Sequence, residues 1–258
     1  MMIARGGQRP EPGTLTKLFF DAVERFDKPD ALQVKIGGRY EPISHRVLAE
    51  RVRRVAGGLQ QLGVTPGDRV AILSENRPEW AIADFACLTA RLTDVAIYPT
   101  LPAQQIAYIL KDSGAVAVFV STREQARKVA EIRGGLPGLR HVIGFDDMGV
   151  GGDVDVQLLA LEERGREGET AASAAAFRDE ALRVQPDDVA TLIYTSGTTG
   201  EPKGVMLTHD NLFSNVTAAL HLIEFTGRDI GLSFLPLSHI FERMAGHYLM
   251  FATGTSIA

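Results

Sequence analysis

Cysteine, long apolar runs and an excess of basic residues are all missing from this sequence. The only cysteine among the 258 residues is Cys87, which excludes a disulfide framework within the chain and favours a reducing compartment. No apolar run is long enough to span a membrane, and residues 1–13 lack the hydrophobic centre of a signal peptide. The 27 Lys and Arg against 32 Asp and Glu weigh against nucleic acid as a partner. We therefore expect a cytoplasmic globular protein, with peripheral contact to a membrane left open.

The segment from Tyr194 to Gly204 has the most informative composition. It reads Tyr-Thr-Ser-Gly-Thr-Thr-Gly-Glu-Pro-Lys-Gly between two apolar runs, so we expect a buried strand to deliver a donor-rich loop to a sheet edge. Glycines let the backbone approach a ligand, hydroxyls donate hydrogen bonds and Lys203 adds a positive charge, which together suit a polyphosphate. The common P-loop is excluded because Lys203 is followed by Gly204. Composition alone would favour an ordinary hairpin loop, whereas the complete ordered string favours phosphate binding.

Short apolar runs alternate with helical patterns along most of the chain. Repeated alternation of this kind implies an α/β fold with mostly parallel sheets flanked by helices. We expect residues 1–13 to be a flexible tail, residues 14–180 a first α/β subdomain, and residues 187–258 the start of a second subdomain that carries the loop. The stretch from Arg164 to Ala176 is rich in Glu, Gly and Ala and is expected to be a surface excursion between them.

The apolar periodicity also predicts individual elements. Helices are predicted at Leu15–Phe26, at 45–62 with Ser44 as the cap, and at Pro78–Arg91, Pro102–Asp112, Arg123–Arg133 and 239–252. A hairpin is predicted at Leu32–Ile36 and Arg39–Pro42, and strands at Val70–Leu73, Val95–Tyr98, Val116–Val120, His141–Phe145, from Val189 onward and at 230–235.

The string from Tyr194 to Gly204 resembles the phosphate-loop signature of the adenylate-forming, or AMP-binding, enzymes. Two further segments, Leu235–Arg243 and Ala71–Trp80 with Ile97–Thr100 after it, resemble the long-chain fatty-acid–CoA ligase branch. The resemblance runs from about Leu15 to the last residue. It implies that residues 14–258 are an incomplete N-terminal domain of such a ligase, with the mobile C-terminal domain and its catalytic lysine absent.

The resemblance further implies a two-step reaction. A carboxylate attacks the α-phosphate of ATP to give an acyl-adenylate and pyrophosphate, and the thiol of CoA then displaces AMP. The implied cofactors are ATP and Mg²⁺, with CoA as a co-substrate and a fatty acid as the acyl substrate. Lys203 is the implied catalytic cation on the pyrophosphate side, and Thr195 offers a hydroxyl to the metal. The residues that match the cofactor-binding cradle are Thr195, Ser196, Gly197, Thr198, Thr199, Gly200, Lys203 and Gly204.

His239 is the second candidate catalytic residue. It lies where a predicted strand gives way to a helix, at the edge where α/β sheets place ligands. The resemblance implies a position near the acyl carboxylate and the α-phosphate, and the alternative is a histidine hydrogen-bonded at a helix start. Phe241 and Met244 either line an acyl tunnel or pack in the core. Glu242 and Arg243 are candidates for ion pairs.

Three functional hypotheses follow. The leading one is ATP-dependent activation of a long-chain fatty acid to acyl-adenylate and then acyl-CoA, by a protein of which this chain is a fragment too short for complete turnover. The second keeps adenylation but changes the acid, or transfers the acyl group to a carrier protein. The third is a nucleotide-binding remnant without turnover. The acyl chain length and the oligomeric state are not fixed by the sequence.

Overall fold

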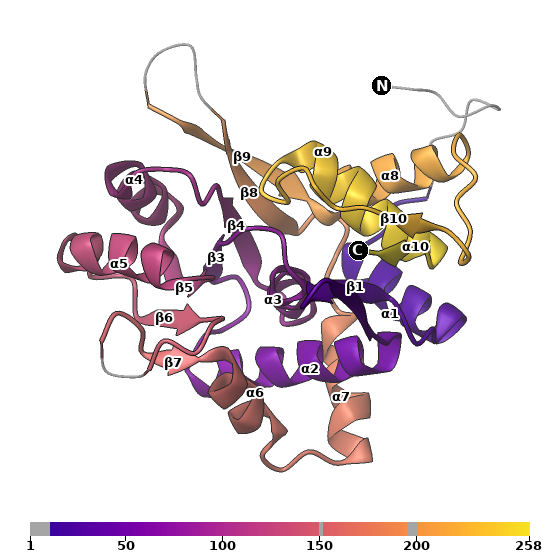
Figure 1. Cartoon of the computed structure of the whole chain (residues 1–258), viewed down its shortest axis with the longest axis horizontal. Coiled ribbons are helices and arrows are strands. Elements are labelled where there is room, and N and C mark those ends of the chain that lie inside the picture. The colour runs from indigo at the N-terminus through magenta and orange to yellow at the C-terminus, as the bar shows by residue number, and fades with distance from the viewer. Residues whose placement is uncertain (1–10, 150–151, 196–200) are drawn as a thin grey trace.

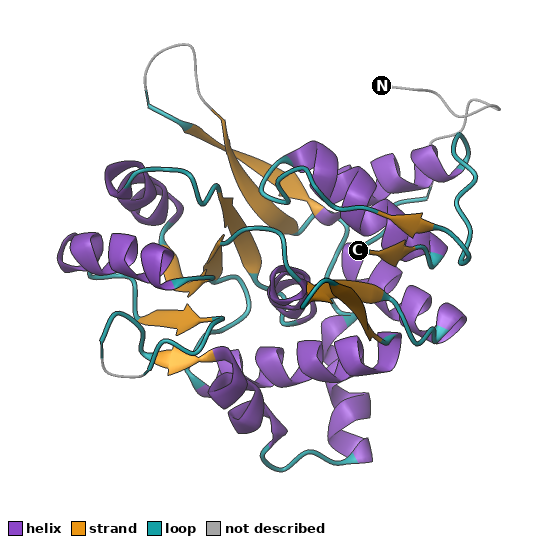
Figure 2. Ribbon diagram, in the orientation of Figure 1, coloured by secondary structure: helices purple, strands orange, loops and turns teal. Residues whose placement is uncertain are grey.

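Two β-sheets and the helices around them make up the part of the chain that the computed structural model describes, which is residues 11–149, 152–195 and 201–258 (Figures 1 and 2). The larger sheet has seven strands and the smaller has four. The strands of the larger sheet, in spatial order, are β7 (Val156–Gln157), β6 (His141–Gly144), β5 (Ala115–Val120), β3 (Arg69–Leu73), β4 (Thr93–Ile97), β8 (Val189–Thr195) and β9 (Lys203–Thr208).

Every neighbouring pair in the larger sheet is parallel except β8 with β9. The strands are apolar on both faces because helices cover both faces. In β3, Val70 and Ile72 join the core on one face, whereas Ala71 and Leu73 join the core on the other. The predicted α/β class and the mostly parallel pairing are therefore confirmed.

Helices lie on both faces of this sheet. The first core includes residues of α1 (Leu15–Phe26), α2 (His45–Gln61) and α3 (Pro78–Thr89), and the second includes residues of α4 (Ala103–Ser113) and α5 (Arg123–Ile132). Local signals set several boundaries: the Ser44 side chain accepts a hydrogen bond from the Val47 N–H at 3.1 Å, and Pro78 is the first residue of α3. Pro102 instead precedes α4 as its N-cap residue.

The smaller sheet joins distant parts of the chain. The predicted hairpin is present as β1 (Leu32–Ile36) and β2 (Arg39–Ile43), and its turn contains Gly37 and Gly38 at φ angles of 57° and 85°. On its other side β1 pairs in parallel with β11 (Ser256–Ile257), which in turn pairs with β10 (Ile230–Gly231). Each sheet therefore contains strands from before residue 181 and strands from after residue 186, which are the limits of the two predicted subdomains. The division into two subdomains stays a prediction.

Three segments differ from the predicted elements. The stretch from Arg164 to Ala176, predicted as a surface excursion, has mostly exposed side chains but is largely helical, as the end of α6 (Leu158–Arg166) and the start of α7 (Ala171–Ala181). Gly165 permits close packing of α6 on α2. The predicted strand 230–235 is a strand only at β10, and the side chains of Leu232 and Phe234 are exposed. The predicted helix 239–252 is divided into α9 (Ile240–Glu242), the π-helix η2 (Arg243–Leu249) and α10 (Met250–Thr253).

The corner between α3 and β4 contains an unusual backbone conformation. Arg91 has a φ of 59°, in the left-handed region that favours glycine. Its guanidinium Nη1 contacts Glu180 Oε1 of α7 at 2.8 Å, while the neighbouring Leu92 is buried. The corner accommodates both bulky residues because the Arg91 side chain reaches α7 and the Leu92 side chain packs in the core.

Candidate functional site

The ends of the β8–β9 pair flank the predicted phosphate loop. Thr195 lies opposite Lys203 and Tyr194 lies opposite Gly204, and the side chains of Thr195 and Lys203 are exposed. Figure 1 shows these two strands extending past α4 at one end of the larger sheet. The predicted ligands Ser196, Gly197, Thr198, Thr199 and Gly200 lie outside the described residues. The structure thus brings Thr195, Lys203 and Gly204 together at the end of a two-stranded ribbon and outside the core.

Tyr194 anchors this ribbon to α4. Its hydroxyl donates a hydrogen bond of 2.6 Å to Asp112 Oδ2 of α4, and burial together with this carboxylate raises the pKa of Tyr194. Gly204 lies against the ring, since a Cβ at that position would be 3.0 Å from Tyr194 Cζ. Gly204 therefore has a packing role in addition to the cofactor-binding role predicted for it. Asp112 was not among the predicted site residues.

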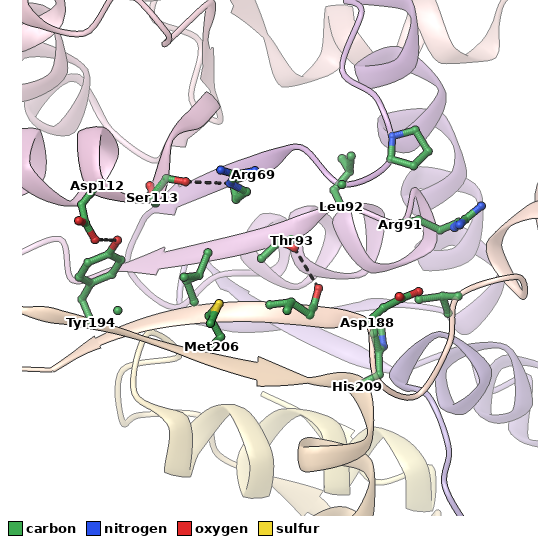
Figure 3. A pocket seen from close by; sticks show the side chains of 16 residues that line it. Arg69, Arg91, Leu92, Thr93, Asp112, Ser113, Asp188, Tyr194, Met206 and His209 are labelled. Carbon is green, nitrogen blue, oxygen red and sulfur yellow. Dashed lines mark hydrogen bonds between the residues drawn. The ribbon is translucent and has the colours of Figure 1, made fainter.

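A groove of about 690 Å³ runs along β8 and β9, and the Tyr194 side chain forms part of its wall (Figure 3). Tyr194 and Met206 line it from the strands, and Asp188 and His209 line it at the far end. Neither Lys203 nor His239 is among the residues that line this groove. Of the predicted site residues that the structure describes, only Gly204 lines the groove.

His239 lies at the start of α9. Its Nδ1 accepts a hydrogen bond of 3.2 Å from the Phe241 N–H, and its ring is exposed. This contact matches the alternative of a histidine at a helix start, and a catalytic role stays a prediction. Phe241 is 56% exposed, which places it outside the core, whereas Met244 is partly buried and packs against the core.

A buried cluster of charges follows His239 in the chain. Arg243 is fully buried and forms ion pairs with Asp84 of α3 and Asp94 of β4, which are also fully buried. Arg243 Nη1 also donates to Thr191 Oγ1 of β8 at 2.7 Å, and Nε donates to the Tyr248 hydroxyl at 2.9 Å. The predicted ion pairing of Arg243 is confirmed. The sequence signal for its partners was an Asp within each of two otherwise apolar segments.

The two aspartates of this cluster titrate differently. Burial is the largest influence on both and favours the protonated form. For Asp84, the attraction of Arg243 together with hydrogen bonds from His247 and Tyr248 outweighs burial and lowers the pKa. For Asp94, burial and the repulsion of Asp84 outweigh the attraction of Arg243 and raise the pKa to about 6. Both carboxyl groups are therefore ionised at neutral pH, so two carboxylates share one guanidinium.

The helix after the ribbon begins with a side-chain cap. The Thr208 side chain accepts a hydrogen bond of 3.2 Å from the Asn211 N–H at the start of α8 (His209–Leu220). His209 is buried, and its Nδ1 accepts from the Leu15 N–H at 3.3 Å. Burial lowers the pKa of His209 to about 4, so the ring is neutral at physiological pH.

The described residues hold no cluster of three His, Cys, Asp or Glu side chains suited to a metal ion. Thr195 supplies a single exposed hydroxyl, so the described side chains do not by themselves form a Mg²⁺ site.

Among the helices that the structure describes, none has the length and apolar character needed to cross a membrane. Cys87 is fully buried, and burial raises the pKa of its thiol.

Comparison with known proteins defines the class. The family described as AMP-binding enzyme matches residues 19–258, so the chain belongs to this family. The chain is 41% identical over 221 residues to the long-chain-fatty-acid–CoA ligase FadD15 of Mycobacterium bovis, covering 84% of this chain and 35% of that protein. It is 32% identical over 254 residues to the peroxisomal long chain acyl-CoA synthetase 7 of Arabidopsis thaliana, covering 94% of this chain and 35% of that protein.

The fold is that of the N-terminal part of adenylate-forming enzymes. A red-emitting luciferase from Phrixothrix hirtus superposes with a TM-score of 0.78 at 21% identity, over 99% of this chain and 48% of that chain. The chain spans about a third of the length of the curated relatives that it matches.

Proposed function

We propose that this chain carries the triphosphate-binding part of an AMP-forming ligase that activates long-chain fatty acids. The observation that carries the proposal is the ordered segment from Tyr194 to Gly204, whose described ends place Thr195 and Lys203 exposed and opposite each other at the end of β8–β9. The long-chain ligases among the relatives support the choice of acyl substrate. The proposed substrates of the whole protein are a fatty acid, ATP and CoA.

In the proposed reaction the residues of this chain act on the leaving side of ATP. The attack of a carboxylate on the α-phosphate brings two negative groups together, so the departing pyrophosphate has to be neutralised. Lys203 supplies a compact positive charge for this purpose, and the Thr195 hydroxyl supplies a hydrogen-bond donor beside it. Mg²⁺ is a proposed cofactor with Thr195 as a proposed ligand, and we assign no step to the metal.

Substitution of Lys203 tests the phosphate assignment. We expect Lys203→Ala to weaken binding of ATP and of inorganic tripolyphosphate by about tenfold, because one charge-assisted contact of about 1.5 kcal/mol is lost. Binding of AMP should change less, since it lacks the phosphates that Lys203 is proposed to contact. Isothermal titration calorimetry on the 258-residue chain measures all three ligands.

Lys35→Ala is the matched control. Lys35 is also an exposed lysine of a β-hairpin, but it belongs to the smaller sheet. Equal affinities of the Lys203 and Lys35 variants for tripolyphosphate, or no tripolyphosphate binding by the unsubstituted chain, would show that the segment is not a phosphate site.

A further inference from the structure

Arg243 connects the two segments that carry the candidate catalytic residues. Its guanidinium donates to Thr191, which lies in β8 four residues before Thr195. Its backbone N–H donates to the carbonyl oxygen of His239 at 3.1 Å, one helical turn earlier in the chain. A single buried side chain therefore contacts the strand that leads into the predicted phosphate loop, while its own backbone continues the helix that begins after His239.

The partners of Arg243 come from several elements. Asp94 of β4 is the register partner of Thr191 in β8, and the Thr191 hydroxyl donates to Asp94 Oδ1 at 2.9 Å. Arg243 Nη1 donates to the same Asp94 oxygen at 2.8 Å, which closes a ring of three hydrogen bonds with Thr191. Asp84 of α3 completes the arrangement by accepting from Nη2, the nitrogen that also donates to Asp94 Oδ2. The cluster thus fixes η2 against α3, β4 and β8.

The π-helix explains how one short segment supplies so many of these contacts. Hydrogen bonds in a π-helix join residues five apart, so residues separated by four and five positions share one face. His247 and Tyr248 therefore lie on the same side as Arg243, and both contact Asp84, at 3.1 Å each. The guanidinium carbon of Arg243 lies 5.2 Å from the centre of the Trp80 ring, so an aromatic side chain covers the cation as well.

A gain in stability is a weak reason for such a cluster. Removing an arginine and two carboxylates from water costs several kcal/mol for each ion, and well-packed apolar side chains of similar volume often give equal stability. The cluster instead fixes how the surrounding elements are oriented, because the planar guanidinium satisfies its partners only in one orientation.

We propose that Arg243 is a positioning residue that holds β8, and with it Thr195, in a fixed relation to the helical segment beginning at His239. The proposal rests on the proposed function for its catalytic meaning. It places Thr191, Asp84 and Asp94 in the same role, as side chains that act through Arg243 and do not touch the substrate.

Thr191→Val tests this role with little change of shape. The substitution removes the hydroxyl that links β8 to Arg243 and Asp94 and leaves both ion pairs of Arg243 in place. We expect tripolyphosphate affinity to fall at least fivefold, and hydrogen exchange of the amides in 192–195 and 240–243 to accelerate together. Thr191→Ser keeps the hydroxyl but loses the methyl group, so it should lower stability while restoring both the affinity and the exchange rates.

Thr93→Val is the matched control. Thr93 is a buried threonine of β4 whose hydroxyl donates to the Val189 carbonyl at the start of β8, at 2.9 Å and away from Arg243. A loss of stability without faster exchange in 240–243 is expected for this variant. The proposal is overturned if Thr191→Val and Thr93→Val affect the two segments alike, or if Thr191→Ser behaves like Thr191→Val.

A second variant removes the charges entirely. Arg243→Met combined with Asp84→Asn and Asp94→Asn leaves no buried unpaired charge, so the chain is expected to fold. Exchange in both segments should still rise, and normal exchange in this variant would overturn the proposal. Because hydrogen exchange needs no ligand, an absence of tripolyphosphate binding by the unsubstituted chain would refute the proposed function while the exchange results still decide the role of Arg243.

Discussion

Two buried titratable residues respond to acid in opposite ways. His209 has its pKa lowered to about 4 by burial, so between pH 6.5 and 4 the unfolded chain binds more protons than the folded one, and stability falls as the pH falls. Asp94 has its pKa raised to about 6, so its contribution to stability falls as the pH rises from 3.8 to 6. Only a comparison of variants separates the two effects.

His209→Gln isolates the histidine. We expect the free energy of unfolding of the unsubstituted chain to drop between pH 7 and pH 5 by about 2 kcal/mol more than that of the variant, because protonation of the buried ring is coupled to unfolding. Urea denaturation at both pH values measures this difference. His221→Gln, at an exposed histidine, is the control and should follow the unsubstituted chain. Parallel pH profiles for His209→Gln and the unsubstituted chain would contradict the assigned pKa.

For single residues, the sequence predicts contacts with near neighbours in the chain better than contacts with distant residues. Ser44 as a helix cap and the hairpin that begins at Leu32 follow from their immediate neighbours, and the structure confirms both. Arg243 was recognised as an ion-pairing residue, but its partner Asp84 is 159 residues away and no local signal joins the two. The hydrogen bond that His209 accepts from Leu15 spans 194 residues and was missed for the same reason.

Among the elements, the crossing of α2 and α6 depends on glycine. A Cβ at Gly165 would lie 1.8 Å from the Arg54 carbonyl oxygen, and a Cβ at Gly58 would lie 2.3 Å from the Leu161 carbonyl oxygen. Around this contact Arg51 Nη2 pairs with Glu162 Oε1 at 2.8 Å. Glycine in a sequence favours a loop prediction, and here two of its occurrences instead let helical backbones touch.

Gly165→Ala should therefore destabilise the chain by about 2–4 kcal/mol, because backbone atoms on both helices would have to move apart. Gly134→Ala is the control, since a Cβ at Gly134 meets nothing within 4 Å. Thermal unfolding of the two variants under identical conditions provides the measurement. A Gly165→Ala chain as stable as the Gly134→Ala chain would show that the two helices are not in backbone contact.

The end of the chain shows why element prediction fails where periodicity changes. Residues 239–252 carry apolar side chains at a spacing that suggests one α-helix, yet the segment changes to a π-helix at Arg243 because its polar side chains turn toward Asp84 and Asp94. Residues 230–235 have the alternation of a strand, but only Ile230 and Gly231 have register partners in β11, and the Ser233 N–H donates to the Ala258 carbonyl at 2.8 Å. Both outcomes depend on tertiary contacts that a local pattern does not contain.

Over the whole molecule, several large apolar side chains remain at the surface. Leu232 and Phe234 follow β10 with exposed fractions of 59% and 73%. Neighbouring apolar side chains left in water promote association between molecules. Because the chain spans about a third of its relatives' length, we assign this property to the 258 residues alone and not to a longer protein.

We expect the 258-residue chain to bind a hydrophobic dye and to associate as its concentration rises. Leu232→Ser combined with Phe234→Ser should reduce both effects while changing the free energy of unfolding by no more than about 0.5 kcal/mol, as is usual for exposed positions. Dye fluorescence and sedimentation velocity follow the change. Leu159→Ser, at another exposed leucine, is the control. Unaltered association in the double variant would point to a different surface.

The small sheet also has a consequence for synthesis on the ribosome. β1 finds its parallel neighbour only in β11, where Leu32 lies opposite Ile257, and Lys28 Nζ reaches the Gly254 carbonyl and the Ser256 hydroxyl at 2.9 and 2.8 Å. A nascent polypeptide would therefore leave the β1 edge of the first hairpin unpaired until more than two hundred further residues have been translated. Strands β3 to β7 of the larger sheet are all translated by Gln157, so we expect folding on the ribosome to begin with them and not with the smaller sheet.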